Sequence, residues 1–410
     1  MKKFSIYAIL NIYSAKGGEQ PLKVVDIRNM AAASNVELIR VDERTICYAE
    51  EKNEEGHNSL FLLSYDRATR RETIIANYLL TNPSYVQHYT LMGNDLIVVM
   101  ENGGSVIWVL RLDVETGEEK NLEEIHLIGS FAGSVVLSAS QLLLFTSEND
   151  LHKKLFEDYR SLTGLSQVVY LYDIDEHRYV YVRDARLCSL RPEQISLFSS
   201  GGESQLLIQE TYGSEQEKET CYRERRWLEK RIWDRIWACP LSRFLQSVQA
   251  HEEYLPLLRL FGADTDGMVR FCSEDRRKLY FRAVYFPKDD ERILAIDKAT
   301  GERSIAAVLR RDDDTSFTFF DRHAGRAYRL QEMRRTYRIT GVLNSHVRAE
   351  YSRDLGIPIG CAEDRYLVAR YVMSDEKDSF VFHSIFDCET GDQQSYECRA
   401  AVKDDTIILY

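Results

Sequence analysis

Two stretches of the chain share one local pattern, VLRLDVETGE at residues 109–118 and ILAIDKATGE at residues 293–302. Each is an apolar run that ends in an aspartate and continues into a polar turn with a glycine. An aspartate side chain can accept hydrogen bonds from the backbone of such a turn, and glycine tolerates positive φ there. The pattern therefore predicts a strand, a tight turn and a returning strand.

Three further segments follow the same pattern more loosely: SLFLLSYDRATR at 59–70, VVYLYDIDEH at 168–177 and FVFHSIFDCETG at 380–391. The shared aspartates are Asp66, Asp113, Asp173, Asp297 and Asp387, and the intervals between them are 47, 60, 124 and 90 residues. Since the last two intervals are about twice the first two, we expect one degenerate copy in each long gap.

A second pair of apolar strands precedes each copy, so that each repeat holds four strands. Four strands per repeat of this length is the arrangement of a β-propeller blade. Eight pairs of first and second strands are expected, near residues 36–50, 85–101, 133–146, 194–211, 267–284, 315–331, 356–372 and 399–410. We predict an all-β fold with one propeller domain over residues 1–410. Seven blades remain an alternative, because the fourth pair lacks a clear second half.

The two ends of the chain complement each other. Residues 4–27 have the pattern of the third and fourth strands of a blade, and residues 399–410 that of its first two strands. We expect the two segments to share one sheet, which would remove the open edge of an incomplete blade.

The D-x-x-T-G turns at Asp113 and Asp297, and more loosely at Asp387, resemble the repeats of quinoprotein-like propellers. The resemblance implies an architecture and no particular family or activity. Enzymes of that class carry a tryptophan shortly after the glycine, a vicinal cysteine pair and a calcium site. The first two features are missing from this sequence, so we expect no cofactor and no metal. The stretch DTDG at 264–267 resembles the start of a calcium loop, but an ordinary turn is the preferred interpretation.

The composition narrows the possible partners and compartments. With 53 Lys+Arg against 65 Asp+Glu, the net charge of −12 argues against binding to nucleic acid or to an anionic membrane. Residues 1–13 imitate a signal peptide without its cleavage site, and no apolar stretch has the length of a membrane span. The eight cysteines form no C-x-x-C motif. We expect a cytoplasmic protein, with secretion or membrane anchoring as the less favoured alternative.

Two segments interrupt the strand pattern, at about residues 147–166 and 214–252. The first is predicted to hold a short amphipathic helix that buries Leu151, Leu155 and Tyr159 against the propeller. In the second, residues 214–239 have a helical pattern ended by Pro240, residues 241–249 a second helix, and residues 253–262 a helix or a strand. Both interruptions are expected to leave the same face of adjacent blades.

The second interruption holds three of the four tryptophans and many arginines, the composition of an interface hot spot. The candidate residues for binding a protein partner are Trp227, Lys230, Arg231, Trp233, Arg235 and Trp237. Because acidic residues nearly balance these cations, a solvated helix face with local ion pairs, packed within the molecule, is the alternative.

Catalytic motifs are missing: the sequence has no G-x-S-x-G elbow, no H-E-x-x-H and no phosphate-binding glycine loop. His88 and Arg40 lie on predicted innermost strands, where polar side chains can face a central channel. A hydrogen-bonded structural histidine is the alternative for His88.

Three functions are compatible with these observations. The preferred one is a non-catalytic binding or scaffold propeller that presents the Trp- and Arg-rich insertion to a protein partner. The alternatives are an enzyme or small-ligand binder, with a glycan as one ligand considered, at the mouth of the channel, and a structural subunit of a larger assembly. Fold alone does not choose among them, and the sequence leaves the ligand, the oligomeric state and the question of catalysis open.

Overall fold

The computed structural model describes residues 24–26, 36–42, 44–54, 57–80, 85–102, 104–163, 165, 167–211, 234–261, 267–285, 290–309, 316–321, 325–343, 346–374, 379–403 and 405–410. The chain forms two compact units. Unit 1 comprises residues 1–32, 330–341 and 345–410, and unit 2 comprises residues 33–329 and 342–344.

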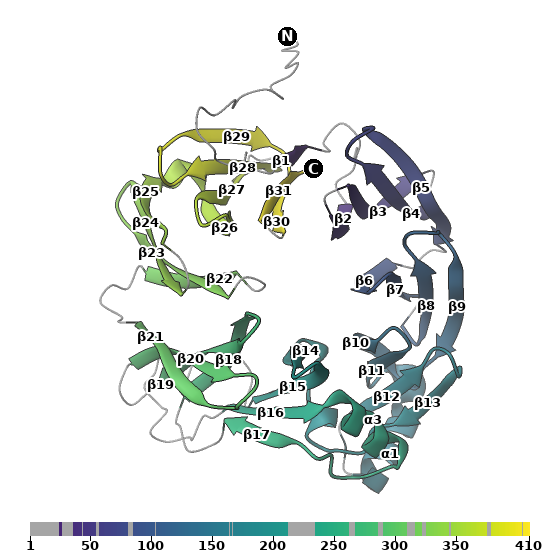
Figure 1. The fold of residues 1–410 in the computed structure, drawn as a ribbon. Helices are drawn as coiled ribbons and strands as arrows, with labels where there is room; N and C mark the ends of the chain where they lie inside the picture. The colour runs from purple at the N-terminus through teal and green to yellow at the C-terminus, as the bar shows by residue number, and fades with distance from the viewer. Residues whose placement is uncertain are drawn as a thin grey trace. The chain divides into compact units, whose positions relative to one another are not determined.

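Unit 2 contains five complete antiparallel sheets of four strands, each in chain order (Figure 1). Their strands are β2 (Val36–Val41), β3 (Thr45–Glu54), β4 (His57–Asp66) and β5 (Arg71–Leu80); β6 (Tyr85–Met92), β7 (Asp95–Glu101), β8 (Val106–Asp113) and β9 (Glu119–His126); β10 (Ser130–Ser138), β11 (Gln141–Ser147), β12 (Val168–Asp173) and β13 (Arg178–Tyr181); β14 (Ile195–Ser200), β15 (Glu203–Thr211), β16 (Asp234–Pro240) and β17 (Leu258–Phe261); β18 (Gly267–Glu274), β19 (Lys278–Tyr285), β20 (Asp290–Asp297) and β21 (Arg303–Leu309).

Three more sheets follow along the chain. A four-stranded sheet has the order β22 (Ser316–Asp321), β23 (Arg326–Glu332), β24 (Thr336–Leu343) and β25 (Arg348–Ser352), and the next has the order β26 (Ile357–Ala362), β27 (Tyr366–Ser374), β28 (Ser379–Asp387) and β29 (Gln393–Glu397). The last sheet holds β1 (Val24–Asp26), β31 (Thr406–Leu409) and β30 (Ala400–Lys403) in that order.

Eight sheets over the described residues, with first and second strands at all eight expected positions, make the fold a single eight-bladed β-propeller. The alternative of seven blades is excluded, because β14 and β15 form the complete fourth pair. The two degenerate repeats are the sheets that begin with β14 and with β22, and each fills one of the long gaps between repeat aspartates.

The repeat aspartates form the turns that the pattern predicts. In each of the five repeats, the backbone N–H groups two and three residues further on donate to the aspartate Oδ1; the aspartates are Asp66, Asp113, Asp173, Asp297 and Asp387. Gly117 closes its turn by donating to the Asp113 carbonyl at 2.9 Å, with a φ of +74°. These hydrogen bonds hold the exit from the third strand of each repeat.

The core lies between neighbouring sheets. The second and third strands are buried most deeply, as the burial of Leu96–Met100 in β7 shows. One apolar cluster joins Leu62 of β4 to Val98 and Leu110 of the next sheet, and another joins Leu143 of β11 to Leu206 of β15. Burying apolar faces of successive sheets against each other is what stabilises a repeat fold of this kind.

Among the described residues, short helices lie in the connections; they are η1 (Asp150–His152), α1 (Lys153–Thr163), η2 (Leu187–Ser189), η3 (Pro192–Gln194), α3 (Leu241–Gln249) and η6 (Arg353–Leu355). Helix α1 connects the second and third strands of its sheet, as predicted for the first interruption. Its buried residue is Phe156, whereas Leu151 is 87% exposed and Leu155 51% exposed. The prediction that these two leucines face the propeller is therefore wrong, although Tyr159 does pack against the core.

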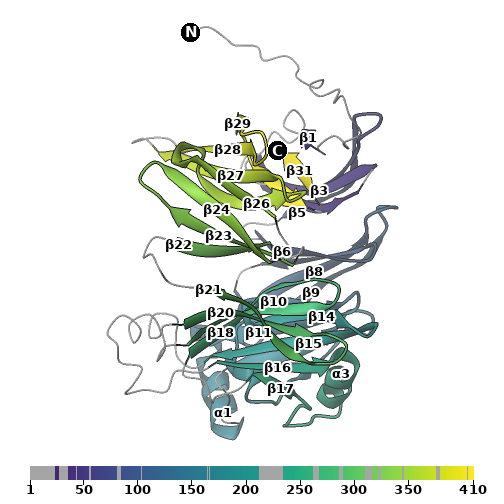
Figure 2. The same cartoon turned by 60° about the vertical axis from the view of Figure 1, so that its left-hand side comes forward.

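The second interruption is only partly helical in the described residues. Helix α3 is present as predicted, but residues 234–239, predicted as helix, belong to strand β16. Pairing of Ile236 with Gln209 and of Cys239 with Leu206 places this segment in the apolar core, which outweighs its helical periodicity. Residues 212–233 and helix α3 therefore adjoin opposite ends of β16. Figure 2 shows α1 and α3 at two separate places.

The chain ends share one sheet, as expected. Val24–Asp26 of β1 pairs with Ile407–Leu409 of β31, but the two strands run parallel, whereas in the sheets β14–β17 and β26–β29 the third strand runs antiparallel to the second. Residues 4–23, predicted to complete this blade, lie outside the described residues. No described helix is long and apolar enough to cross a membrane.

Candidate functional site

Four of the predicted partner-binding residues, Trp227, Lys230, Arg231 and Trp233, lie outside the described residues. The other two are on β16 and contact the rest of the molecule. Trp237 donates from Nε1 to Glu210 at 3.0 Å and lies under the Arg186 guanidinium, and Arg235 forms an ion pair with the same Glu210 at 3.6 Å. For Trp237 and Arg235, these contacts support the alternative interpretation, in which the residues pack within the molecule.

The two channel candidates lie on the first strands of adjacent sheets and have different partners. His88 on β6 lies 3.2 Å from Ser134 Oγ on β10, and burial lowers the pKa of its imidazole. Arg40 on β2 forms ion pairs with Asp42 at 3.4 Å and Glu115 at 3.6 Å. His88 and Arg40 thus share no partner. Among the described residues, no carboxylate lies beside His88 to accept its proton.

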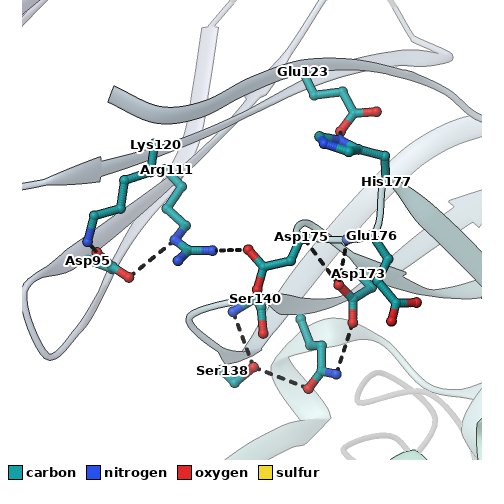
Figure 3. Close-up of polar contacts among 11 residues, drawn as sticks. Asp95, Arg111, Lys120, Glu123, Ser138, Ser140, Asp173, Asp175, Glu176 and His177 are labelled. Carbon is teal, nitrogen blue, oxygen red and sulfur yellow. Dashed lines mark hydrogen bonds and ion pairs between the residues drawn. The ribbon is translucent and has the colours of Figure 1, made fainter. Parts of the chain in front are cut away.

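A polar cluster lies between the sheets that begin with β6 and β10 (Figure 3). Arg111 of β8 contacts Asp95 at 3.2 Å and Asp175 of the next sheet at 2.6 Å, while Lys120 contacts Asp95 at 2.5 Å. His177 contacts Glu123 across the same pair of sheets at 2.6 Å. These ion pairs connect two blades. Because the charges neutralise one another, the cluster offers little uncompensated charge to a ligand.

An arginine-rich pocket lies within unit 1, and sequence reasoning missed it. Its volume is about 1160 Å³. The walls come from the turn between β23 and β24, from β25 with η6, and from the ends of β26 and β27. We call it the arginine pocket, and its arginines are Arg334, Arg335, Arg353 and Arg370.

The positive charge of the arginine pocket is largely uncompensated. The exposed side chains of Arg334, Arg335 and Arg370 make no hydrogen bond or ion pair with any residue that the structure describes. Arg353 is fixed by Glu332 at 2.5 Å and by the ring of Tyr337, whose centroid lies 5.6 Å away. The lining thus holds four guanidinium groups against one carboxylate, in a chain whose net charge is −12.

The one lining carboxylate, Asp354, is engaged locally. Ser352 donates its hydroxyl to Asp354 at 3.2 Å and caps η6 by accepting the Asp354 N–H. Behind the lining, His383 of β28 is buried and lies 2.6 Å from the Cys398 carbonyl. Burial and the positive charge of Arg370 lower the pKa of His383, so its imidazole is neutral at neutral pH and adds no charge.

Apolar side chains complete the arginine pocket. Ile357 and Ile359 on β26 point outward with exposed fractions of 52% and 44%, and Tyr371 and Val372 on β27 are also exposed. Guanidinium groups present fixed planar donors for carboxylate or phosphate oxygens. Such a surface can bind an anion that also carries apolar groups.

The backbone conformation requires a glycine at one position in the lining of the arginine pocket. Gly356 follows η6 with a φ of +93°, and a Cβ there would lie 2.2 Å from the Arg370 carbonyl oxygen. Only glycine permits this close approach of η6 to β27. In the sequence, the Arg-Arg pair at 334–335 is the one visible signal of the site, and nothing local indicates that Arg353 and Arg370 come to the same place.

Neither a protein-family model nor a curated protein matches the chain. Solved structures that are similar include a prolyl endopeptidase at 10% identity and a TM-score of 0.47, which matches 88% of this chain and 49% of its own. An uncharacterized protein of Listeria monocytogenes has 7% identity and a TM-score of 0.44, with 92% of this chain and 97% of its own covered.

The β-propeller domain of the Trilobed protease of Pyrococcus furiosus is a third example, at 10% identity and a TM-score of 0.44, covering 88% of this chain and 96% of its own. This chain spans about half the length of the prolyl endopeptidase chain that it matches. At these identities and TM-scores the similarity carries no argument about activity, and the fold assignment rests on the strand order.

Proposed function

We propose that this propeller is a non-catalytic binding protein and that it captures an anionic ligand in the arginine pocket. The observation that carries the proposal is that three of the four arginines lining the pocket form no ion pair with any described residue, and that the lining holds one carboxylate against four guanidinium groups. Like charges gathered in this way repel one another, and a bound anion would relieve that repulsion.

The chemistry of the lining supports binding more than catalysis. Its described residues include no histidine or cysteine, and both Asp354 and Ser352 are occupied with each other. A general base or a nucleophile would need one of these groups within reach of the ligand. Guanidinium groups keep their protons at neutral pH and serve as fixed donors.

Isothermal titration calorimetry with hexaglutamate tests the proposal, with hexalysine as the control ligand. We expect wild-type protein to bind hexaglutamate alone, and binding to weaken at least about tenfold in an Arg335→Gln, Arg370→Gln variant, since each charge-assisted hydrogen bond contributes about 1.5–3 kcal/mol. Arg276→Gln, Arg277→Gln, which changes two arginines remote in sequence from the pocket, is the matched control. Equal binding by all three proteins would contradict the proposal.

A protein partner at residues 212–233 is the second candidate function. It is supported by the segment of η1 and α1, which connects the second and third strands of the preceding sheet and exposes Leu151 and Leu162. Residues 212–233 make the same connection in their own sheet. Affinity capture with wild type and with a Trp227→Ala, Arg231→Ala variant tests it, and equal recovery of every partner would count against it.

A further inference from the structure

The arginine pocket adjoins a sheet edge that lacks a neighbouring strand. Strand β27 is paired with β26 only as far as Arg370, which lies opposite Ile357. Beyond that point Tyr371–Ser374 pair with β28 alone, opposite Phe382–Ser379. Among the described residues, no strand pairs with these four on the side of β26, and Tyr371 and Val372 line the pocket.

The direction of the backbone groups along this edge follows from Gly356. The Arg370 carbonyl oxygen faces Gly356, on the β26 side of β27. Because hydrogen-bonding groups of an antiparallel strand alternate between its two neighbours, the N–H and C=O groups of Val372 and Ser374 face the same open side. An open edge of this kind is a template for an added strand.

The side chains around the edge restrict what could be added. Arg334 and Arg335 on one wall and Arg370 on β27 are complementary to acidic groups, whereas Tyr371, the next residue along β27 and therefore on its other face, is complementary to an apolar group. Side chains of an extended strand alternate between two faces, so one strand can meet both demands. A volume of about 1160 Å³ also exceeds the range of about 300–1,000 Å³ typical of small-molecule sites.

We infer that the ligand of the arginine pocket is an extended acidic peptide with alternating apolar residues, which adds as a strand to β27 at Val372 and Ser374. Backbone hydrogen bonds to this edge would supply affinity, and the arginines would select acidic side chains. The inference rests on the proposed function, and it specifies the class of anion.

The probe is a fluorescein-labelled peptide Glu-Leu-Glu-Leu-Glu-Leu, measured by fluorescence anisotropy. Two analogues carry N-methyl groups, one on its glutamate nitrogens and the other on its leucine nitrogens. A strand paired along one edge presents every second N–H to the protein. We therefore expect one analogue to bind at least tenfold more weakly than the parent peptide and the other within about twofold of it.

Variants of the protein test the backbone hydrogen bonds between the peptide and the edge of β27 by changing the protein in place of the peptide. Val372→Pro removes the N–H that faces the open edge and leaves the pairing of β27 with β28 intact, and proline is tolerated on sheet edges. Val372→Ala is the matched control, because it removes the side chain and keeps the N–H. We expect at least fivefold weaker peptide binding in Val372→Pro than in Val372→Ala, with equal thermal stability of the two.

The outcomes separate this inference from the proposed function. If both N-methylated peptides bind like the parent and still depend on Arg335 and Arg370, the pocket binds anions and the strand pairing is wrong. The same holds if inorganic phosphate or citrate competes as strongly as the peptide. If neither the peptide nor hexaglutamate binds the wild-type protein, the proposed function fails as well.

Discussion

At the scale of single residues, the aspartate turns are the feature that recurs throughout the chain. Backbone N–H groups at the turn hold the pKa of Asp113 and Asp297 below the usual value, and in Asp387 the paired Arg365 also lowers the pKa against the effect of burial. Each carboxylate thus stabilises the folded state only while it is ionised.

This makes the protein sensitive to acid. A folded-state pKa below the ordinary value of 3.8 means that the unfolded chain binds protons first as the pH falls. The stabilisation is present above pH 3.8 and is lost as the pH falls through the folded-state pKa. We expect the Tm to fall steeply below about pH 4. The variant Asp113→Asn, Asp297→Asn, Asp387→Asn should have a lower Tm at pH 7 and a shallower acid decline; an unchanged slope would contradict this.

His177 has the opposite dependence on pH. Its contact with Glu123 raises the pKa of the imidazole above the ordinary value of 6.5. The contribution to stability is present below pH 6.5 and is lost as the pH rises through the folded-state pKa. Histidine NMR titration should give a raised pKa for His177 that returns toward 6.5 in Glu123→Gln. A His177 pKa that is the same in both proteins would rule out the contact.

At the scale of elements, helix α1 has a buried face that periodicity alone did not reveal. The pattern of Leu151, Leu155 and Tyr159 predicts one apolar stripe, but the buried residue is Phe156, which packs where Gly129 leaves room beside it. Helical periodicity identifies the helix, whereas the side that meets the propeller depends on the sheet beneath it.

The two faces of α1 can be distinguished by substitution. Phe156→Ala should destabilise the protein by about 3–5 kcal/mol, as expected for removal of a fully buried aromatic ring. Leu155→Ala, on the exposed face, should change the stability by less than about 0.5 kcal/mol. Urea unfolding measures both values, and equal losses would restore the leucine face as the buried one.

Strand order, turn positions and the pairing of the chain ends could be predicted because each repeats one local pattern. The strand at residues 234–239 could not be predicted, since IWAC at 236–239 fits a helix and a strand equally. Its pairing with β15 determines that it forms a strand. The arginine pocket also escaped prediction. Its arginines come from two connections and one strand, and only the tertiary structure brings Arg335, Arg353 and Arg370 to one place.

At the scale of the whole molecule, the last sheet joins residues from both chain ends. Ile407, Ile408 and Leu409 of β31 are fully buried and lie between β30 and β1. Deleting Thr406–Tyr410 should lower the free energy of unfolding by about 5 kcal/mol or more, at about 1.5–3 kcal/mol for each buried aliphatic side chain. Tyr410→Ala is the control that keeps β31. Unchanged unfolding of the truncated chain would show that this sheet contributes little.

We propose that the whole molecule captures its ligand at one place, the arginine pocket and its open strand edge. Hydrogen–deuterium exchange across the whole chain, with and without the Glu-Leu peptide, tests it most directly, because every segment is observed at once. We expect slower exchange in segments 333–337, 352–359 and 370–374 and no change elsewhere. Protection confined to residues 212–233 and α1, or no protection by a saturating peptide, would contradict it.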